Sequence, residues 1–246
     1  MDAGGGESEQ VSAGCTRPDA LYAECATLQL PLDYEEPDGV MINYFVKRVS
    51  SSRPKKDGAG TIWLLNGGPG FSGVTMECML PQIIDLTEGR FDVAIPDHRG
   101  TGRSSPLFCD WEDDSAAFSK ECVDAAMEHY GIQYLNHFTT PNAARDMHAA
   151  IDQIGRRTPE RPVMIHAVTY GTILAQRFLQ IFPDGVDAVV LDSVVSPDLM
   201  RSPWTSPPAN AAIAVLVDEC ANDPNCKSLM VGTRRIHPFY RMQLVS

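Results

Sequence analysis

Four short apolar runs, each followed by a glycine-rich or polar segment, constrain the fold of this chain most. They are residues 61–65 (TIWLL), 91–95 (FDVAI), 162–166 (PVMIH) and 186–191 (VDAVVL). Continuous runs of this kind are typical of parallel strands buried on both faces. The segments that come after them are NGGPG, PDHRGTGRSS, AVTYGT and DSVVSP. Ligands bind beyond the carboxyl ends of such strands, so these segments are the expected place of a functional site.

Helical patterns fill the gaps between the strands. Thr139, Thr140 and Pro141 cap a helix that Gly155 ends, and further helices are expected over residues 115–130 and 171–182. Residues 26–32 and 41–49 predict an antiparallel pair of strands around a turn-rich stretch at 34–39. Alternating strands and helices predict a doubly wound α/β fold with a mostly parallel sheet.

Charge and hydropathy exclude two classes of partner. The 246 residues carry 20 basic and 32 acidic side chains, a net charge of -12, which argues against binding of nucleic acid. The longest uninterrupted aliphatic run, Ala211 to Val217, is too short for a membrane span.

Seven cysteines indicate disulfides more than a metal site. None of their spacings is the CxxC of a zinc site. The spacing suggests three local pairs and leaves Cys78 over; the pairs are Cys15 with Cys25, Cys109 with Cys122, and Cys220 with Cys226. Short-loop disulfides imply an oxidising compartment, and reduced thiols are the alternative. Residues 1–14 have no apolar segment of the kind found in a signal peptide.

Residues 167–172 (AVTYGT) stand between an expected strand and an expected helix. This is the context of a nucleophile elbow, usually G-x-S-x-G, with Thr169 at the nucleophile position and Ala167 in place of the first glycine. A plain strand-to-helix turn is the alternative. The successive glycines of NGGPG can aim backbone N–H groups at an oxyanion. In the segment PDHRGTGRSS, Arg99 is expected to brace the loop rather than to act in catalysis.

NGGPG, PDHRGTGRSS and VTYGT, in this order, resemble the α/β-hydrolase family. More narrowly, they are similar to its secreted tripeptidyl-aminopeptidase and proline-iminopeptidase branch of serine peptidases, as are CATLQLPLDY (25–34) and LFC (107–109). The resemblance covers roughly residues 15–226. It implies acyl-enzyme hydrolysis that removes short peptides or single residues from a free N-terminus, with no cofactor and no metal, in a secreted protein.

The same resemblance assigns roles to site residues. Thr169 stands where the family has its serine nucleophile, and the oxyanion donors fall on Gly68, or Gly67, and on Tyr170. A β-branched residue is a poor fit at the strained elbow. The fold places the acid and then the histidine of its triad after the nucleophile. His237 is the only histidine there, with Asp218 or Asp223 as its acid, and an ordinary surface histidine is the alternative.

The length then bears on function. Only 53 residues come after Ser193 (246 minus 193), too few for the remaining strands and loops of this fold. We therefore expect residues 15–195 to be the N-terminal part of the core, and 196–246 to be the start of a truncated cap. The sequence favours a serine-peptidase-type hydrolase that is inactive or incomplete in this chain. A non-catalytic pseudoenzyme or gene fragment that binds a peptide or partner is one alternative, and an esterase or lipase acting on a small ester is another.

Overall fold

The computed structural model describes residues 7–10, 22–50, 60–107, 124, 127–128, 131–154, 158, 160–196 and 222. The chain divides into two compact units, residues 1–195 and 196–246. Nearly all described residues belong to the first unit. The predicted cap and its candidates His237, Asp218 and Asp223 lie outside the described residues.

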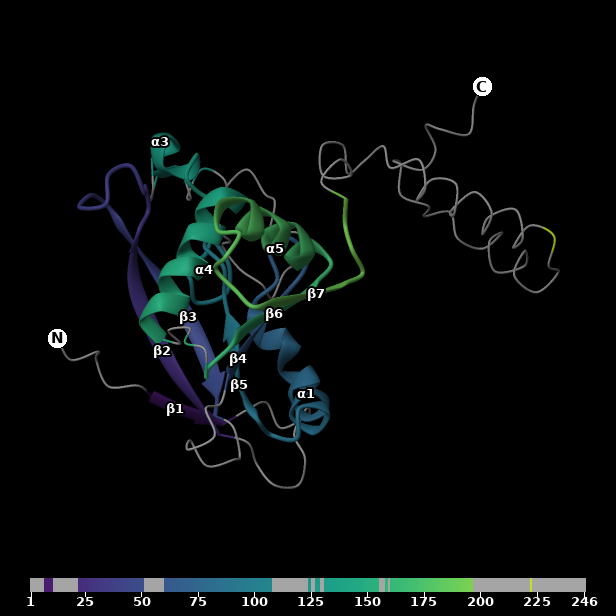
Figure 1. Ribbon diagram of the computed structural model, residues 1–246. Helices are drawn as coiled ribbons and strands as arrows, with labels where there is room; N and C mark the ends of the chain where they lie inside the picture. The colour runs from purple at the N-terminus through teal and green to yellow at the C-terminus, as the bar shows by residue number, and fades with distance from the viewer. Residues whose placement is uncertain are drawn as a thin grey trace. The chain divides into compact units, whose positions relative to one another are not determined.

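The described residues form a mixed sheet of seven strands in the order β1-β2-β3-β5-β4-β6-β7 (Figure 1). β4, β5, β6 and β7 run parallel to one another, and β1, β2 and β3 are added on one side by antiparallel pairing. The strands are β1 Glu7–Gln10, β2 Tyr22–Pro31, β3 Met41–Val49, β4 Gly60–Leu65, β5 Phe91–Pro96, β6 Val163–Val168 and β7 Ala188–Asp192. The predicted α/β fold with a mostly parallel sheet is confirmed.

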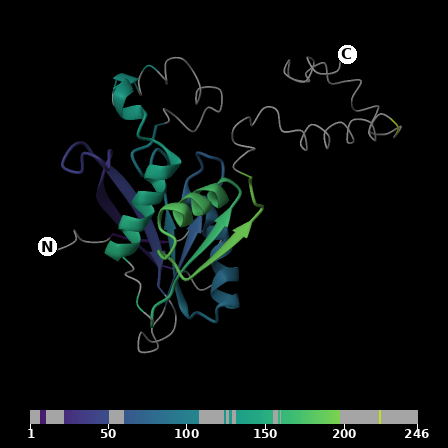
Figure 2. The same cartoon turned by 45° about the horizontal axis from the view of Figure 1, so that its top comes forward.

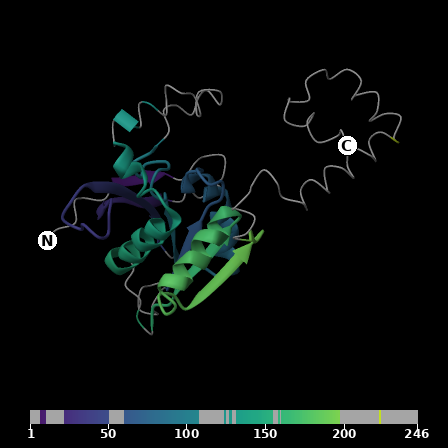
Figure 3. The same cartoon turned by 90° about the horizontal axis from the view of Figure 1, so that it is seen from above.

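Helices cover both faces of the sheet. α4 (Thr140–Ile154) and α5 (Tyr170–Ile181) lie on one face, and the 3-10 helix η3 (Gly73–Met79) continues into α1 (Leu80–Leu86) on the other (Figures 2 and 3). A short helix, α3 (Ile132–Leu135), precedes α4.

The strand β4 shows why an uninterrupted apolar run was needed. Trp63 and Leu65 pack into the core beneath α4 and α5, whereas Ile62 and Leu64 pack into the core beneath η3 and α1. Because successive side chains point to opposite faces and both faces are covered, every position of the strand is buried.

The observed bounds differ from the predicted ones mainly at strand ends. β3 matches its prediction, β2 begins four residues earlier than predicted, and β6 continues two residues further, to Val168. The N–H of Asn142 donates to Oγ1 of Thr139 over 3.4 Å, which confirms the predicted cap of α4. The η3–α1 segment was not predicted, and the predicted helix at 115–130 lies largely outside the described residues.

One cysteine prediction was wrong. Cys78, in η3, takes part in a disulfide, although its spacing left it without a partner. Its partner lies outside the described residues. Cys25 is buried in β2, and the other five cysteines are not described, so the three local pairs stay predictions. Spacing suggests only neighbours in sequence, whereas a disulfide requires proximity in space. Among the described helices, none is long and apolar enough to cross a membrane.

Candidate active site

Thr169 occupies a strained backbone position between the end of β6 and the start of α5. Its φ of 51° and ψ of -118° lie in a region that β-branched residues rarely adopt. Such strain persists only where the surrounding structure holds it, and it is concentrated at functional sites. Strand, strained turn and helix therefore give this segment the backbone geometry of a nucleophile elbow.

Backbone and side-chain hydrogen bonds hold the elbow in place. The N–H of Thr169 donates to the carbonyl oxygen of Asp192 over 3.1 Å, at the end of the neighbouring strand β7. The carbonyl oxygen of Thr169 accepts from the N–H of Thr172 at 2.9 Å and from its Oγ1 at 2.6 Å. Oγ1 of Thr172 in turn accepts from the N–H of Val195 at 3.0 Å. The backbone of Asp192 thus helps to hold the elbow.

The glycine loop after β4 lies directly against the elbow. A Cβ atom on Gly67 would stand 1.6 Å from Oγ1 of Thr169, so the threonine hydroxyl occupies the space that a side chain at 67 would need. A Cβ on Gly171, two residues after Thr169, would stand 2.4 Å from the carbonyl oxygen of Leu65. Both glycines are required because two backbone segments approach each other closely at the ends of β4 and β6.

A buried aspartate ties the glycine loop to the loop after β5. Oδ1 of Asp97 accepts from Oγ of Ser72 at 2.8 Å and from the N–H of Gly73 at 2.7 Å. Its Oδ2 accepts from the N–H of Arg103 at 2.8 Å and leaves no room for a side chain at Gly102. Asp97 therefore fixes both loops relative to the elbow, a role that the sequence did not suggest.

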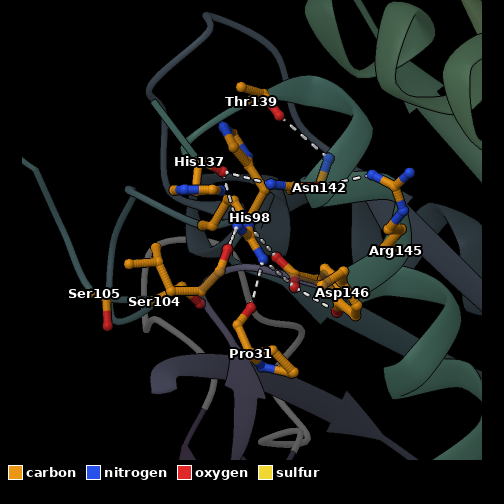
Figure 4. A network of polar contacts seen from close by, with 12 residues as sticks. Pro31, His98, Ser104, Ser105, His137, Thr139, Asn142, Arg145 and Asp146 are labelled. Atoms are coloured by element: carbon orange, nitrogen blue, oxygen red, sulfur yellow. Dashed lines mark hydrogen bonds and ion pairs between the residues drawn. The ribbon is translucent and has the colours of Figure 1, made fainter. Parts of the chain in front are cut away.

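Arg99 braces the loop after β5, as predicted. All five of its N–H groups donate within the described structure. Nε and Nη2 each donate over 2.7 Å to a carboxylate oxygen of Asp146 in α4. Nη1 donates over 2.8 Å to the carbonyl oxygens of Leu32 and His137, and Nη2 also donates over 3.0 Å to that of Pro31. Figure 4 shows Asp146, Pro31 and His137 gathered at this network.

Tyr34 completes the environment of Asp146. Its hydroxyl donates to Oδ1 of Asp146 over 2.7 Å, and its ring lies 5.7 Å from the guanidinium carbon of Arg99. Burial raises the pKa of Asp146, and the hydrogen bonds and charge of Arg99 oppose that rise. The sequence identified Arg99 but neither of these partners.

The side chain of Tyr170, the residue after Thr169, contacts α4 and the loop after β5. Its hydroxyl lies 3.0 Å from Oγ1 of Thr140 in α4, and its ring centroid lies 5.6 Å from that of His98. The side chain is almost fully buried, and burial raises its pKa. Its backbone is thereby fixed at the first position of α5, where N–H groups of a helix point outward and attract negative charge.

His98 makes the fold sensitive to acid. Burial lowers its pKa from 6.5 to about 4, although the nearby Asp97 carboxylate opposes the shift. Above pH 6.5 the imidazole is neutral in both states. Below it the unfolded chain takes up the proton first, so the free energy of unfolding falls until about pH 4, by about 3 kcal/mol in total.

We expect His98→Gln to remove this part of the acid sensitivity. Urea unfolding of both proteins at pH 7 and pH 4.5 measures it. The drop in the free energy of unfolding should be smaller in the variant, and an equal drop in both proteins would assign the acid sensitivity to other groups.

Three of the described histidines, His98, His137 and His148, have partners other than Thr169, and the fourth, His166, lies within β6. The ring of His148 stacks on Phe182 at 3.9 Å, that of His137 lies 3.7 Å from a carboxylate oxygen of Asp33, and that of His98 packs on Tyr170. Among the described residues, no group of three His, Cys, Asp or Glu side chains is placed to hold a metal ion.

The comparison with known families agrees with this geometry. Residues 60–219 match the model of the alpha/beta hydrolase fold. The chain therefore belongs to the α/β-hydrolase fold family.

Relatives with curated names point to hydrolases. The chain is 30% identical to a tripeptidyl aminopeptidase of Streptomyces lividans, over 71% of this chain and 36% of that protein. It is 26% identical to a proline iminopeptidase of Aeromonas sobria, over 73% and 39%, and 28% identical to a carboxylesterase B of Mycobacterium tuberculosis, over 71% and 36%. The chain thus spans little more than a third of the length of these relatives.

Proposed function

We propose that this protein is a hydrolase of the serine-peptidase type, which cleaves N-terminal peptide bonds through an acyl-enzyme with Thr169 as nucleophile. The observation that carries the proposal is the elbow geometry of Thr169, with its hydroxyl set against the glycine loop. The names of the relatives favour a peptide substrate with a free N-terminus, from which a tripeptide or a single residue is released.

In the proposed reaction the hydroxyl oxygen of Thr169 attacks the scissile carbonyl carbon. The hydroxyl proton passes to a base and then to the departing amine, whose C–N bond breaks and leaves an ester on Thr169. Water then hydrolyses this ester. His237 with Asp218 or Asp223 stays a prediction for the base and acid, because none of these residues is described.

The oxyanion donors are proposed to be the N–H groups of Gly68 and Tyr170. The N–H of Gly67 already donates over 2.7 Å to Oδ1 of Asn66, which favours Gly68 of the two candidates in this loop. Gly68 also has a φ of 108°, a conformation that favours glycine. The N–H of Tyr170 is at the start of α5, where the helix dipole adds to the stabilisation of a developing negative charge.

Substitution of Thr169 tests the nucleophile. Thr169→Ser is expected to raise turnover about tenfold, because loss of the β-methyl relieves about 1 kcal/mol of strain and opens the approach to the carbonyl. Thr169→Ala should abolish turnover. Hydrolysis of peptidyl chromogenic substrates by the purified protein measures both, with Thr87→Ser, at the distant end of α1, as the control. Turnover that survives Thr169→Ala would exclude this nucleophile.

A non-catalytic binding protein is the second candidate. It is favoured by the threonine at a position where its β-branch is strained. It predicts no turnover even for Thr169→Ser, together with an increase of about 1 kcal/mol in the free energy of unfolding for Thr169→Gly, because glycine tolerates this backbone.

An ester is the second class of substrate that a relative suggests. Hydrolysis of a short p-nitrophenyl ester, measured beside that of the peptides, distinguishes an esterase from a peptidase.

The disulfide of Cys78 favours an oxidising compartment, in keeping with a secreted protein.

A further inference from the structure

Phe71 is a large apolar side chain that the loop after β4 leaves exposed. Its exposed fraction is 56%, although it stands between the buried end of β4 and the partly buried helix η3. Single exposed apolar residues are common on protein surfaces. Phe71 differs from such residues because it belongs to the loop that packs against Thr169.

That loop is held rigidly on both sides of Phe71. The carbonyl oxygen of Ser72 accepts from Nδ2 of Asn66 at 2.8 Å. Oγ of Ser72 and the N–H of Gly73 both donate to the buried carboxylate of Asp97, at 2.8 and 2.7 Å. The ring is therefore presented to solvent from a fixed backbone, so a ligand that binds it would have little loop entropy to overcome.

Two adjacent glycines of this loop relate the ring of Phe71 to the hydroxyl of Thr169. The space for a Cβ at Gly67 is taken by Oγ1 of Thr169. At the adjacent Gly68, a Cβ would stand 3.1 Å from the backbone nitrogen of Phe71 and 3.4 Å from Cδ2 of its ring. The hydroxyl of Thr169 and the ring of Phe71 therefore each approach one of two consecutive glycines, so both lie at the same short stretch of backbone.

We propose that Phe71 is a specificity-determining residue, whose ring binds an apolar side chain flanking the scissile bond. This inference rests on the proposed function of Thr169. Small-molecule sites combine an apolar wall with a few placed polar groups, and here the ring would be the wall beside the hydroxyl of Thr169. A phenyl ring offers a large contact area, and it has little conformational freedom to lose when a ligand packs on it.

The test measures binding without turnover. In the Thr169→Ala protein, the affinities of the tetrapeptides Ala-Ala-Leu-Ala, Ala-Ala-Ala-Leu and Ala-Ala-Ala-Ala are measured by calorimetry or NMR titration, with and without Phe71→Ala. We expect Phe71→Ala to weaken at least one leucine peptide about tenfold and the all-alanine peptide less than twofold. The position of the affected leucine shows on which side of the scissile bond the ring acts.

Leu86→Ala is the matched control. Leu86 is 85% exposed and ends α1 a few residues before β5 begins. It therefore lies near the amino ends of the parallel strands, whereas the elbow lies at their carboxyl ends. It should change no affinity. Equal losses for all three peptides, no loss, or no binding of any peptide would each overturn the inference.

A turnover series separates this inference from the proposed function. If Thr169→Ser hydrolyses the leucine peptides and Phe71→Ala in that background raises KM without changing kcat, both stand. If turnover depends on Thr169 but the preference for leucine survives Phe71→Ala, the role of Phe71 fails and that of Thr169 does not. If neither Thr169 protein hydrolyses any peptide but leucine-selective binding still depends on Phe71, the proposed chemistry fails and the binding role stands.

Discussion

Replacing Asp146 by alanine is expected to lower the free energy of unfolding by about 3 to 5 kcal/mol. The carboxylate of Asp146 is fully buried and accepts two hydrogen bonds from Arg99, which is itself 4% exposed. Its removal leaves a guanidinium charge without a counter-ion inside the protein. Urea unfolding at pH 7 measures the loss.

Two controls separate this charge effect from a general weakness of α4. Asp152→Ala, at an exposed position of the same helix, should change the free energy of unfolding by less than about 0.5 kcal/mol. The double variant Arg99→Met with Asp146→Leu should be more stable than Asp146→Ala alone, because no buried charge is left unpaired. A small effect of Asp146→Ala would mean that solvent reaches Arg99.

Replacing Gly67 by alanine is expected to lower Thr169-dependent turnover by at least about a hundredfold. The new Cβ would lie 1.6 Å from Oγ1 of Thr169, so the hydroxyl has to leave the position from which we propose that it attacks. Hydrolysis of peptidyl chromogenic substrates by Gly67→Ala, in the wild-type and the Thr169→Ser background, measures the loss.

The clash also predicts a coupling between the two positions. Gly67→Ala should lower the free energy of unfolding in the wild-type background, and much less in a Thr169→Ala background, because the atom it collides with is gone. Equal costs in both backgrounds would show that the hydroxyl is not packed against the glycine loop.

Local patterns were enough to predict most of the fold. The run TIWLL predicted a strand buried on both faces, and β4 packs Trp63 to one side and Ile62 to the other. The N-terminal cap of α4 is determined by neighbours in sequence, so it too could be predicted. The segment Gly73–Leu86 was missed because it begins as a 3-10 turn and its helical part is short.

The residues that hold the loops in place could not be predicted from local patterns. Arg99 was predicted to brace its loop, but its partner Asp146 lies 47 residues further along the chain. Asp97 holds Ser72 and Gly73 across two different loops. Such contacts arise from the order of strands in the sheet, and no local pattern in one sequence encodes them.

The sequence by itself determined the class of fold, the place of the elbow and the identity of Thr169 at its centre, because strands, turns and caps depend on residues close together in the chain. Only the tertiary structure decided that Thr169 adopts the strained elbow conformation, with Gly67 against its hydroxyl and Phe71 exposed in the same glycine loop. Those relations arise where β4 and β6 end side by side in the sheet, although about a hundred residues separate them along the chain.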